Sequence, residues 1–406
     1  MANSPVATNG LLLLLLLSVY VALPCLGDCA GGSTQADWLA CRSKFISAIF
    51  NRSTLPSRDQ PDYIIPLPTY AMYGFPGPGN GVGNASGNSW KNNMTSFVWE
   101  ITSPFISLNS TIYYTLNTSG TAPRNWPQDG PTMPDTPIAP STIGDTVIIY
   151  HNGHETDSCT PNFDGVVDYF NELGYDVMEM FMPLYGCNAD TPYGQPYNHQ
   201  WFEQWELKGD FTMRFFIEPV VLTVNYALKL GYKHVVLLGL SGGGWTTTVT
   251  AAVDPRITLS IPIAGSVPKW ATPLYPFSVP DLPEMDGDYE QQVARPMYQQ
   301  CAFVCMYTLA ALEAGRTQVQ VLHQDDPCCY AAQSLHPEIK QYNAFVQSQP
   351  AVAGWMQSMA TAGNIHQVNL RDKVVATYAI EKLRLKGVVS KQDLVAVPFD
   401  VLQVQQ

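Results

Sequence analysis

From residue 145 onward, short apolar runs alternate with longer stretches in which apolar residues recur every three or four positions. The short runs predict buried strands and the longer stretches predict helices. The strands are expected at 147–150, 177–182, 235–238, 257–263, 318–322 and 355–359. The helices are expected at 163–173, 211–230, 245–253, 297–312, 331–346 and 371–385. This alternation predicts an α/β protein with a mainly parallel sheet and helices on both faces.

The chain before residue 145 has a different pattern. An amphipathic helix is expected at 37–50. Its buried face is expected to consist of Trp38, Phe45, Ile46 and Ile49. Residues 51–94 are rich in Pro, Gly and Asn and are expected to be irregular. Strands at 96–101 and 111–116 would form an antiparallel edge of the sheet. We therefore expect an N-terminal extension (28–94), a main domain (95–390) and a C-terminal tail (391–406).

The first residues have the length and composition of a signal peptide. An apolar run begins with seven leucines at 11–17 and continues to Leu26, which is short for a membrane span. Cleavage after Gly27 would fit the preference for small residues, so residues 1–27 are expected to be removed. Residues 1–10 contain no Lys or Arg, which departs from the usual positive start, and an uncleaved anchor is the alternative. The sequence predicts a secreted protein without membrane attachment after cleavage.

Composition agrees with an extracellular location. The net charge is -13 and only 14% of residues are charged, which argues against nucleic acid or an anionic membrane surface as a partner. Five Asn-x-Ser/Thr sequons predict glycans on the N-terminal third of the chain: Asn51, Asn84, Asn93, Asn109 and Asn117.

The cysteines predict a disulfide framework. Eight of the nine remain after signal cleavage: Cys29, Cys41, Cys159, Cys187, Cys301, Cys305, Cys328 and Cys329. We expect the first two to pair with each other and Cys159 to pair with Cys187. The pair at 301 and 305 would bond to the adjacent pair at 328 and 329, and a bond between the adjacent two is the less favoured alternative. A zinc site is disfavoured because no Cys-x-x-Cys pair occurs.

The strongest chemical pattern is Gly239-Leu-Ser-Gly-Gly243, which follows a buried strand and precedes a helix. Ser241 is then expected in a strained turn between strand and helix, because Gly239 and Gly243 let the two elements cross closely. The turn exposes the serine hydroxyl at the carboxyl edge of the sheet, where ligands bind in such folds.

Residues 95–386 resemble the α/β-hydrolase family, in which the catalytic serine lies between a strand and a helix, as is expected for Ser241 here. The resemblance implies Ser241 as nucleophile, followed in the chain by an acid and then a histidine base. It also implies an oxyanion hole made by the amide of Gly242 and a second donor from the loop after the strand at 147–150. That loop contains His151-Asn-Gly-His154, so the donor is Gly153 or His154. The inserted Asn152 departs from a plain His-Gly pair.

Three histidines follow Ser241, and only one lies where the resemblance places the base. His323 precedes the candidate acids, and His336 begins a predicted helix. His366 lies in a glycine-containing loop after the last strand and is expected to be the base.

The acid is expected in Gln324-Asp-Asp-Pro327, which follows the penultimate predicted strand. Adjacent residues point in opposite directions, so only one of Asp325 and Asp326 can face the histidine. We expect Asp326, because Pro327 restricts it to extended or turn geometry, and Asp325 remains the alternative.

Two loops border the expected site. Residues 184–206 mix aromatic and amide side chains, which fits either a surface for sugars or aromatic acyl groups, or simple packing. Residues 266–296 are proline-rich and are expected to form a lid. The acids at 286–290 lack EF-hand spacing and are expected to be a solvated turn rather than a calcium site. A metal site at His151 and His154 lacks a helical context, and we expect no metal and no cofactor.

These observations predict a secreted serine hydrolase that cleaves a small-molecule or carbohydrate-linked carboxylic ester through an acyl-enzyme. A serine peptidase is the alternative, because Gly244 extends the glycine run, although no propeller repeat accompanies it. A non-catalytic binding protein on the same fold is a third possibility, but no expected triad member is missing.

Overall fold

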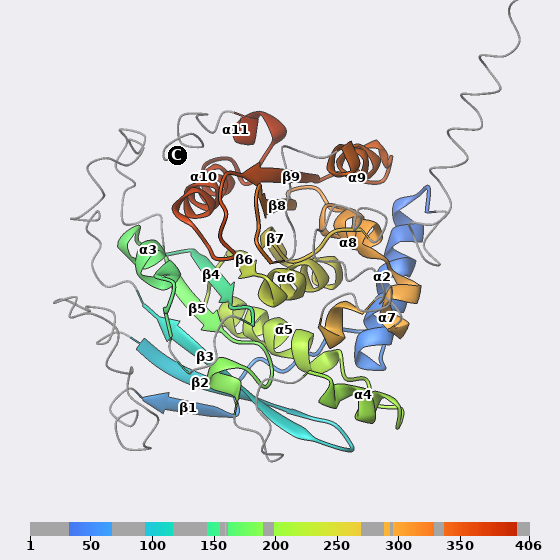
Figure 1. Cartoon of the computed structure of the whole chain (residues 1–406), viewed down its shortest axis with the longest axis vertical. Coiled ribbons are helices and arrows are strands. Elements are labelled where there is room, and N and C mark those ends of the chain that lie inside the picture. Colours follow the sequence, from blue (N-terminus) through green and yellow to red (C-terminus); the bar gives the residue numbers. More distant parts are fainter. Residues whose placement is uncertain are drawn as a thin grey trace, which may run out of the picture.

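The computed structural model describes residues 32–66, 94–116, 144–154, 159, 161–189, 199–268, 288–292, 295–328 and 337–395 (Figure 1). The predicted signal peptide and most of both the predicted lid and the predicted tail lie outside these residues. So do Cys29, Cys329, His336 and the sequons at Asn84, Asn93 and Asn117.

A single mixed sheet runs through the described part of the chain. Its strands are β1 (Tyr63–Pro66), β2 (Met94–Thr102), β3 (Ser107–Thr115), β4 (Thr146–His151), β5 (Asp176–Met180), β6 (His234–Leu240), β7 (Ile257–Ile263), β8 (Thr317–His323) and β9 (Trp355–Thr361). The order across the sheet is β1-β2-β3-β5-β4-β6-β7-β8-β9. The first three strands and the β3–β5 pair are antiparallel, and all pairs from β5 to β9 are parallel. The predicted parallel sheet with an antiparallel edge is confirmed.

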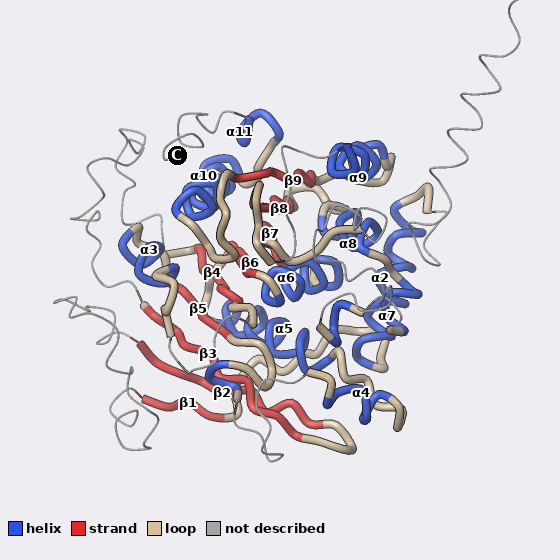
Figure 2. The backbone as a smooth tube through the Cα atoms, in the orientation of Figure 1, coloured by secondary structure: helices blue, strands red, loops and turns tan. Residues whose placement is uncertain are grey.

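Helices cover both faces of this sheet (Figure 2). They are α2 (Gln35–Phe50), α3 (Val166–Glu172), α4 (Trp201–Glu206), α5 (Arg214–Lys229), α6 (Gly242–Val253), α7 (Pro296–Gln300), α8 (Phe303–Ala310), α9 (Pro337–Ser348), α10 (Leu370–Lys386) and α11 (Lys391–Val395), with short 3-10 turns η5 (Gly186–Asn188) and η7 (Tyr289–Gln291). The core between the sheet and α3, α10 and α11 is separate from the core that α2 and α4 to α9 share with the other face. Among the described residues, no helix combines the length and the apolar composition that crossing a bilayer requires.

Two predictions about the elements are wrong. Residues 51–94 are not wholly irregular, since β1 adds an edge strand that pairs with β2. The helix predicted at 297–312 is two helices, because Cys301 and Ala302 adopt extended backbone between α7 and α8. The apolar pattern does not show this break, because buried apolar residues lie on both sides of it, at Met297 and Tyr298 in α7 and along the whole of α8.

A disulfide lies at the break between α7 and α8. Cys301 is bonded to Cys305, across the start of α8, so the predicted cross-link of this pair to positions 328 and 329 is wrong. Cys159 is bonded to Cys187, as predicted. Cys41 and Cys328 are also disulfide-bonded.

Helix α2 begins with a capping box in which the side chains of Thr34 and Asp37 exchange hydrogen bonds with each other's backbone. Its predicted apolar face is confirmed, because all four expected residues are buried: Trp38, Phe45, Ile46 and Ile49. The helix therefore belongs to the core on one face of the sheet rather than to a detached extension.

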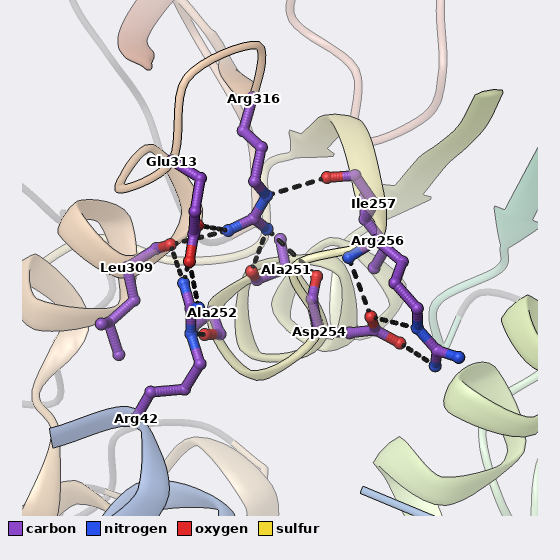
Figure 3. A network of polar contacts seen from close by, with 9 residues as sticks. All are labelled: Arg42, Ala251, Ala252, Asp254, Arg256, Ile257, Leu309, Glu313 and Arg316. Atoms are coloured by element: carbon purple, nitrogen blue, oxygen red, sulfur yellow. Dashed lines mark hydrogen bonds and ion pairs between the residues drawn. The ribbon is translucent and has the colours of Figure 1, made fainter. Parts of the chain in front are cut away.

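A buried arginine, Arg42, fastens α2 to the end of α6 (Figure 3). Its Nε donates to the carbonyl of Ala252 at 2.9 Å, its Nη2 donates to the carbonyl of Leu309 at 2.8 Å, and both of its terminal nitrogens contact Glu313. Arg316 donates to the carbonyl of Ala251 in the last turn of α6 and to that of Asp254, the residue directly after the helix. The last carbonyls of a helix have no partner within the helix, so these two cations satisfy and stabilise that end of α6.

Candidate active site

Ser241 lies between β6 and α6 in a backbone conformation that side chains rarely adopt, with φ 55° and ψ -122°. Such a conformation costs about 1–3 kcal/mol and persists only where the surroundings impose it. Here they do, because the strand and the helix cross too closely for side chains. A Cβ added to Gly239 would lie 2.2 Å from the carbonyl oxygen of Gly243, and one added to Gly243 would lie 2.0 Å from that of His151. The predicted turn is therefore present.

Asp326 and His366 follow neighbouring strands. β8 and β9 are parallel and end together at His323 and Thr361, so the loops after them leave the same edge of the sheet. His366 Nδ1 lies 2.9 Å from Oδ2 and 3.0 Å from Oδ1 of Asp326, which is only 3% exposed. The Asp326 carboxylate also accepts a hydrogen bond from the amide of Cys328 at 2.8 Å. The structure thus brings together the two residues expected to be acid and base.

The neighbouring carboxylate is oriented differently. The side chain of Asp325 is exposed, and its amide donates to the carbonyl of Gly363 at 3.0 Å. Of the two adjacent aspartates, the one before Pro327 is therefore the partner of His366.

The other described histidine after Ser241 has a structural environment. His323 Nε2 lies 2.8 Å from Asp372, and both side chains are fully buried. Asp372 also accepts from the hydroxyl of Thr361 and from the amide of Asn369, and so joins the start of α10 to the ends of β8 and β9. Burial alone would lower the pKa of His323, but the hydrogen bond and charge of Asp372, together with the nearby Asp326 carboxylate and a backbone hydrogen bond with Ile365, raise the pKa above its usual value.

The expected oxyanion-hole residues lie on the loop after β4 and at the start of α6. β4 and β6 pair in parallel with His151 opposite Gly239, so the loop after β4 meets the start of α6. Gly242 is the first residue of α6, and a Cβ added to it would lie 2.6 Å from Cε1 of His154. Gly153 is buried directly beside His154. Gly242 and His154 therefore meet at the helix terminus, where backbone N–H groups favour negative charge.

A buried carboxyl that the sequence analysis did not identify holds the loop after β4. The side chain of Asn152 donates to Oε1 of Glu179 at 2.9 Å, and the amide of Asn162 donates to the same carboxyl at 2.9 Å. Burial raises the pKa of Glu179 to about 8, so this group is mainly protonated at neutral pH. The only signal in the sequence was an acid within the apolar run of β5.

Two further residues near His154 were also missed, His199 and Glu290. The expectation that Glu290 belongs to a solvated acidic turn is wrong, because Glu290 is 0% exposed and contacts both His154 and His199. The neighbouring Tyr289 explains this, since its ring is buried, its hydroxyl contacts that of Thr212, and Arg295 covers its face. These contacts hold η7 against the domain.

The aromatic side chains of the loop after β5 contribute to packing. Phe202 and Trp205 are buried, and the Phe202 ring lies 5.0 Å from that of Phe216 and 5.8 Å from that of Tyr289. Of the two interpretations of this loop, packing is therefore the one that its described aromatic residues support.

Comparison with known protein families finds no match, and comparison with curated protein sequences finds none either. Several solved structures resemble this one at low sequence identity. An acetyl xylan esterase from Paenibacillus sp. R4 is 11% identical with a TM-score of 0.47, over 88% of this chain and 96% of its own. Est1E from Butyrivibrio proteoclasticus is 16% identical with a TM-score of 0.39, over 71% of this chain and 98% of its own.

A puromycin-hydrolyzing peptidase of Mycobacterium tuberculosis is 14% identical with a TM-score of 0.44, over 72% of this chain and 39% of its own. This chain therefore spans less than half of the length of that peptidase. The sheet order, its parallel strands from β5 to β9 and the turn at Ser241 together show that the chain has the α/β-hydrolase fold.

Proposed function

We propose that the protein is a serine hydrolase that cleaves carboxylic esters through an acyl-enzyme, with Ser241, His366 and Asp326 as its catalytic residues. The observation that carries this proposal is the Asp326–His366 contact at the sheet edge where Ser241 occupies its strained turn. A carboxylate on Nδ1 fixes the histidine tautomer and leaves Nε2 free of its proton, which is the form that a general base needs.

The proposed reaction uses these groups in two halves. His366 Nε2 takes the proton of the Ser241 hydroxyl while Oγ attacks the acyl carbon, and the oxyanion is held by the amide of Gly242 and a donor from Gly153 or His154. His366 returns the proton to the leaving alcohol, which leaves the acyl group on Ser241. Water then attacks the acyl-enzyme with the same histidine as base, and the products are an acid and an alcohol.

The substrate and the cellular setting are part of the proposal. A small-molecule or carbohydrate-linked ester is the proposed substrate, and a secreted glycoprotein is the proposed form. The leucine-rich first 27 residues support secretion, and the exposed side chains of Asn51 and Asn109 leave two sequons accessible to a glycan. The second candidate is a peptidase of the same fold, which Gly244 favours by extending the glycine run after Ser241.

Labelling with a fluorophosphonate, combined with a panel of p-nitrophenyl esters and aminoacyl anilides, tests the proposal. We expect the wild-type protein to be labelled on Ser241 and to cleave esters. Ser241→Ala should abolish labelling and lower kcat by several orders of magnitude. The control Ser348→Ala removes an exposed serine hydroxyl on α9 and should change neither readout. Turnover of anilides alone would favour the peptidase, and ordinary activity in Ser241→Ala would refute the proposal.

A further inference from the structure

We propose that His154, His199 and Glu290 form a binding site for a divalent cation of the zinc type. The three residues come from the loop after β4, the segment before α4 and the turn η7. Their ligand atoms all lie within 4.8 Å of one another. The site would add a metal to a protein for which the sequence, judged on His151 and His154 alone, predicted none.

The distances between the ligand atoms match those of a metal centre. His154 Nε2 lies 3.2 Å from His199 Nδ1 and 3.2 Å from Glu290 Oε1, and His199 Nδ1 lies 2.8 Å from Glu290 Oε2. Tetrahedral zinc with bonds of about 2.0–2.1 Å separates its ligand atoms by about 3.3 Å. The separation between the two nitrogens and the one between His154 Nε2 and Oε1 correspond to edges of such a tetrahedron. Glu290 contacts His199 through its other oxygen, so its carboxylate would rotate to present one oxygen to the cation.

The second nitrogen of each histidine is held by an acceptor. His199 Nε2 lies 2.7 Å from the carbonyl oxygen of Pro183, and His154 Nδ1 lies 3.3 Å from a carboxylate oxygen of Asp288. The carbonyl of Pro183 can only accept, so His199 Nε2 carries the proton, and the Asp288 carboxylate favours a proton on His154 Nδ1. In the neutral rings the lone pairs of His154 Nε2 and His199 Nδ1 then face each other and Glu290. An outer acceptor that fixes the tautomer in this way is the usual second shell of a metal-bound histidine.

Three electron-pair donors that converge in a buried space need a positive charge between them. Glu290 is 0% exposed, and no Lys or Arg of the described residues forms an ion pair with it. Its Oε1 accepts no hydrogen bond within the part of the chain that the structure describes. A proton on His199 would satisfy the contact with Oε2, and the contact with Oε1 would need a second proton on His154, which would place two cationic rings 3.2 Å apart. A single metal ion would satisfy all three groups.

The donor set indicates which cation fits. Two imidazole nitrogens and one carboxylate suit Zn²⁺, whereas Ca²⁺ and Mg²⁺ prefer oxygen ligands throughout. Three protein ligands leave a fourth position for water. The other cluster of potential ligands in the described chain, formed by Cys41, Cys301 and Cys305, is unsuitable because all three cysteines are in disulfides.

A cation at this position would join three separate segments beside the candidate oxyanion hole, because the ring of His154 lies against Gly242. Binding of the cation does not depend on the hydrolase reaction. It can therefore be measured in the Ser241→Ala protein, where a failure of the proposed reaction has no effect on the result.

Calorimetric titration of the full chain without a histidine tag, first treated with a chelator, tests the site with ZnCl₂. We expect Ser241→Ala to bind one equivalent of Zn²⁺, and Co²⁺ in its place to give the visible absorption of a tetrahedral site. Glu290→Gln should weaken Zn²⁺ binding by more than about 100-fold, because loss of an outer-shell partner alone costs about 10- to 100-fold. The matched control Glu218→Gln alters a buried carboxylate that faces Arg52 and Arg214, and it should bind Zn²⁺ like the parent.

A second variant covers the case in which Glu290→Gln does not fold. Asp288 has a half-exposed side chain, so Asp288→Asn should fold normally and weaken Zn²⁺ binding by about 10-fold. Absence of Zn²⁺ binding in Ser241→Ala, or unchanged affinity in either folded variant, would overturn the proposal. Either of these results would mean that protons on the histidines, rather than a metal ion, supply the positive charge beside Glu290.

Discussion

Asp326 and Asp325 are adjacent in sequence, and the structure separates them completely: one is buried against His366, and the other is exposed. This difference makes the acid of the proposed reaction testable at the level of one side chain. An amide at position 326 would still fill the space, but it would no longer fix the histidine tautomer.

We therefore expect Asp326→Asn to lower kcat by about 1,000- to 10,000-fold with the fold intact. Asp325→Asn, which removes an equal charge one residue away, should leave kcat within about 2-fold, since its carboxylate does not contact His366. Steady-state kinetics with a p-nitrophenyl ester and circular dichroism of both variants provide the measurement. A large loss in Asp325→Asn alone would transfer the role to that residue.

Glu179 makes a prediction about stability and pH. Its pKa is raised by burial to about 8 in the folded protein, compared with about 4.5 in the unfolded chain. Between these values the folded state binds more protons than the unfolded state, so this group's contribution to stability falls as pH rises from about 4.5 to 8. Glu179→Gln, which imitates the protonated form, should reduce that slope.

Urea unfolding of the wild type and of Glu179→Gln at several pH values between 5 and 8 measures this effect. The difference between the two free energies of unfolding should change steadily with pH in favour of the variant. Parallel pH profiles of the two proteins would show that Glu179 is ionised in the folded state.

Among individual residues, the sequence predicted those whose role depends on a local pattern. Ser241 lies in a five-residue motif, and Asp326 and His366 each follow a predicted strand, so their place at the sheet edge followed from the topology. Glu290 and His199 were missed because they are 91 positions apart and meet only through packing around Tyr289. Nothing near either residue indicates the other.

Among the elements, α6 is constrained at both of its ends. Ser241 precedes its first residue, and buried arginines hold its last turn. Arg42 reaches this turn from α2, far away in the sequence. The N-terminal helix therefore helps to fix the element that positions Ser241.

Replacing Arg42 by methionine should leave the carbonyl of Ala252 without this donor while keeping most of the side-chain volume. We expect Arg42→Met to lower the free energy of unfolding by about 2–4 kcal/mol, since buried groups lose their partners. Lys44→Met changes an exposed charge on the same helix and should stay within about 0.5 kcal/mol of the wild type. Denaturant unfolding measures both, and equal stability of the two variants would contradict this account of α2.

The sequence failed to predict two features, β1 and the break between α7 and α8, because the local pattern of residues indicates neither of them. β1 has only four residues and gains its structure from pairing with β2, which local composition cannot indicate. The interruption between α7 and α8 has buried apolar residues of one helix before it and of the other after it, so the apolar pattern continues across it. Long periodic segments such as α10 were predicted closely, because their buried face determines them.

For the whole molecule, the alternation of strands and helices was sufficient to predict the sheet class. The parallel order from β5 to β9 places the loops after β4, β6, β8 and β9 at one edge, and this is why the Asp326–His366 pair and the contact between Gly242 and His154 lie at that edge. The exact pairing of the antiparallel edge depended on contacts between β3 and β5, which periodicity does not encode.

The turn at Ser241 also has a consequence for the stability of the entire chain. Glycine adopts a positive φ without steric cost, so Ser241→Gly should relieve the strain and raise the free energy of unfolding by about 1 kcal/mol, after allowing for the greater freedom of glycine in the unfolded chain. Thermal and denaturant unfolding of this variant, with Ser348→Gly as a control at an ordinary helical position, measure the difference. A less stable Ser241→Gly would show that the turn is unstrained.

If that result is obtained, selection on folding and selection on chemistry oppose each other at position 241. A lineage that no longer needed the hydroxyl would lose it readily, because replacement of the serine by glycine would make the folded protein more stable. Retention of serine in a conformation that disfavours it is then a record of continuing use, and the residue found at this position in related chains becomes a simple indicator of which of them are still enzymes.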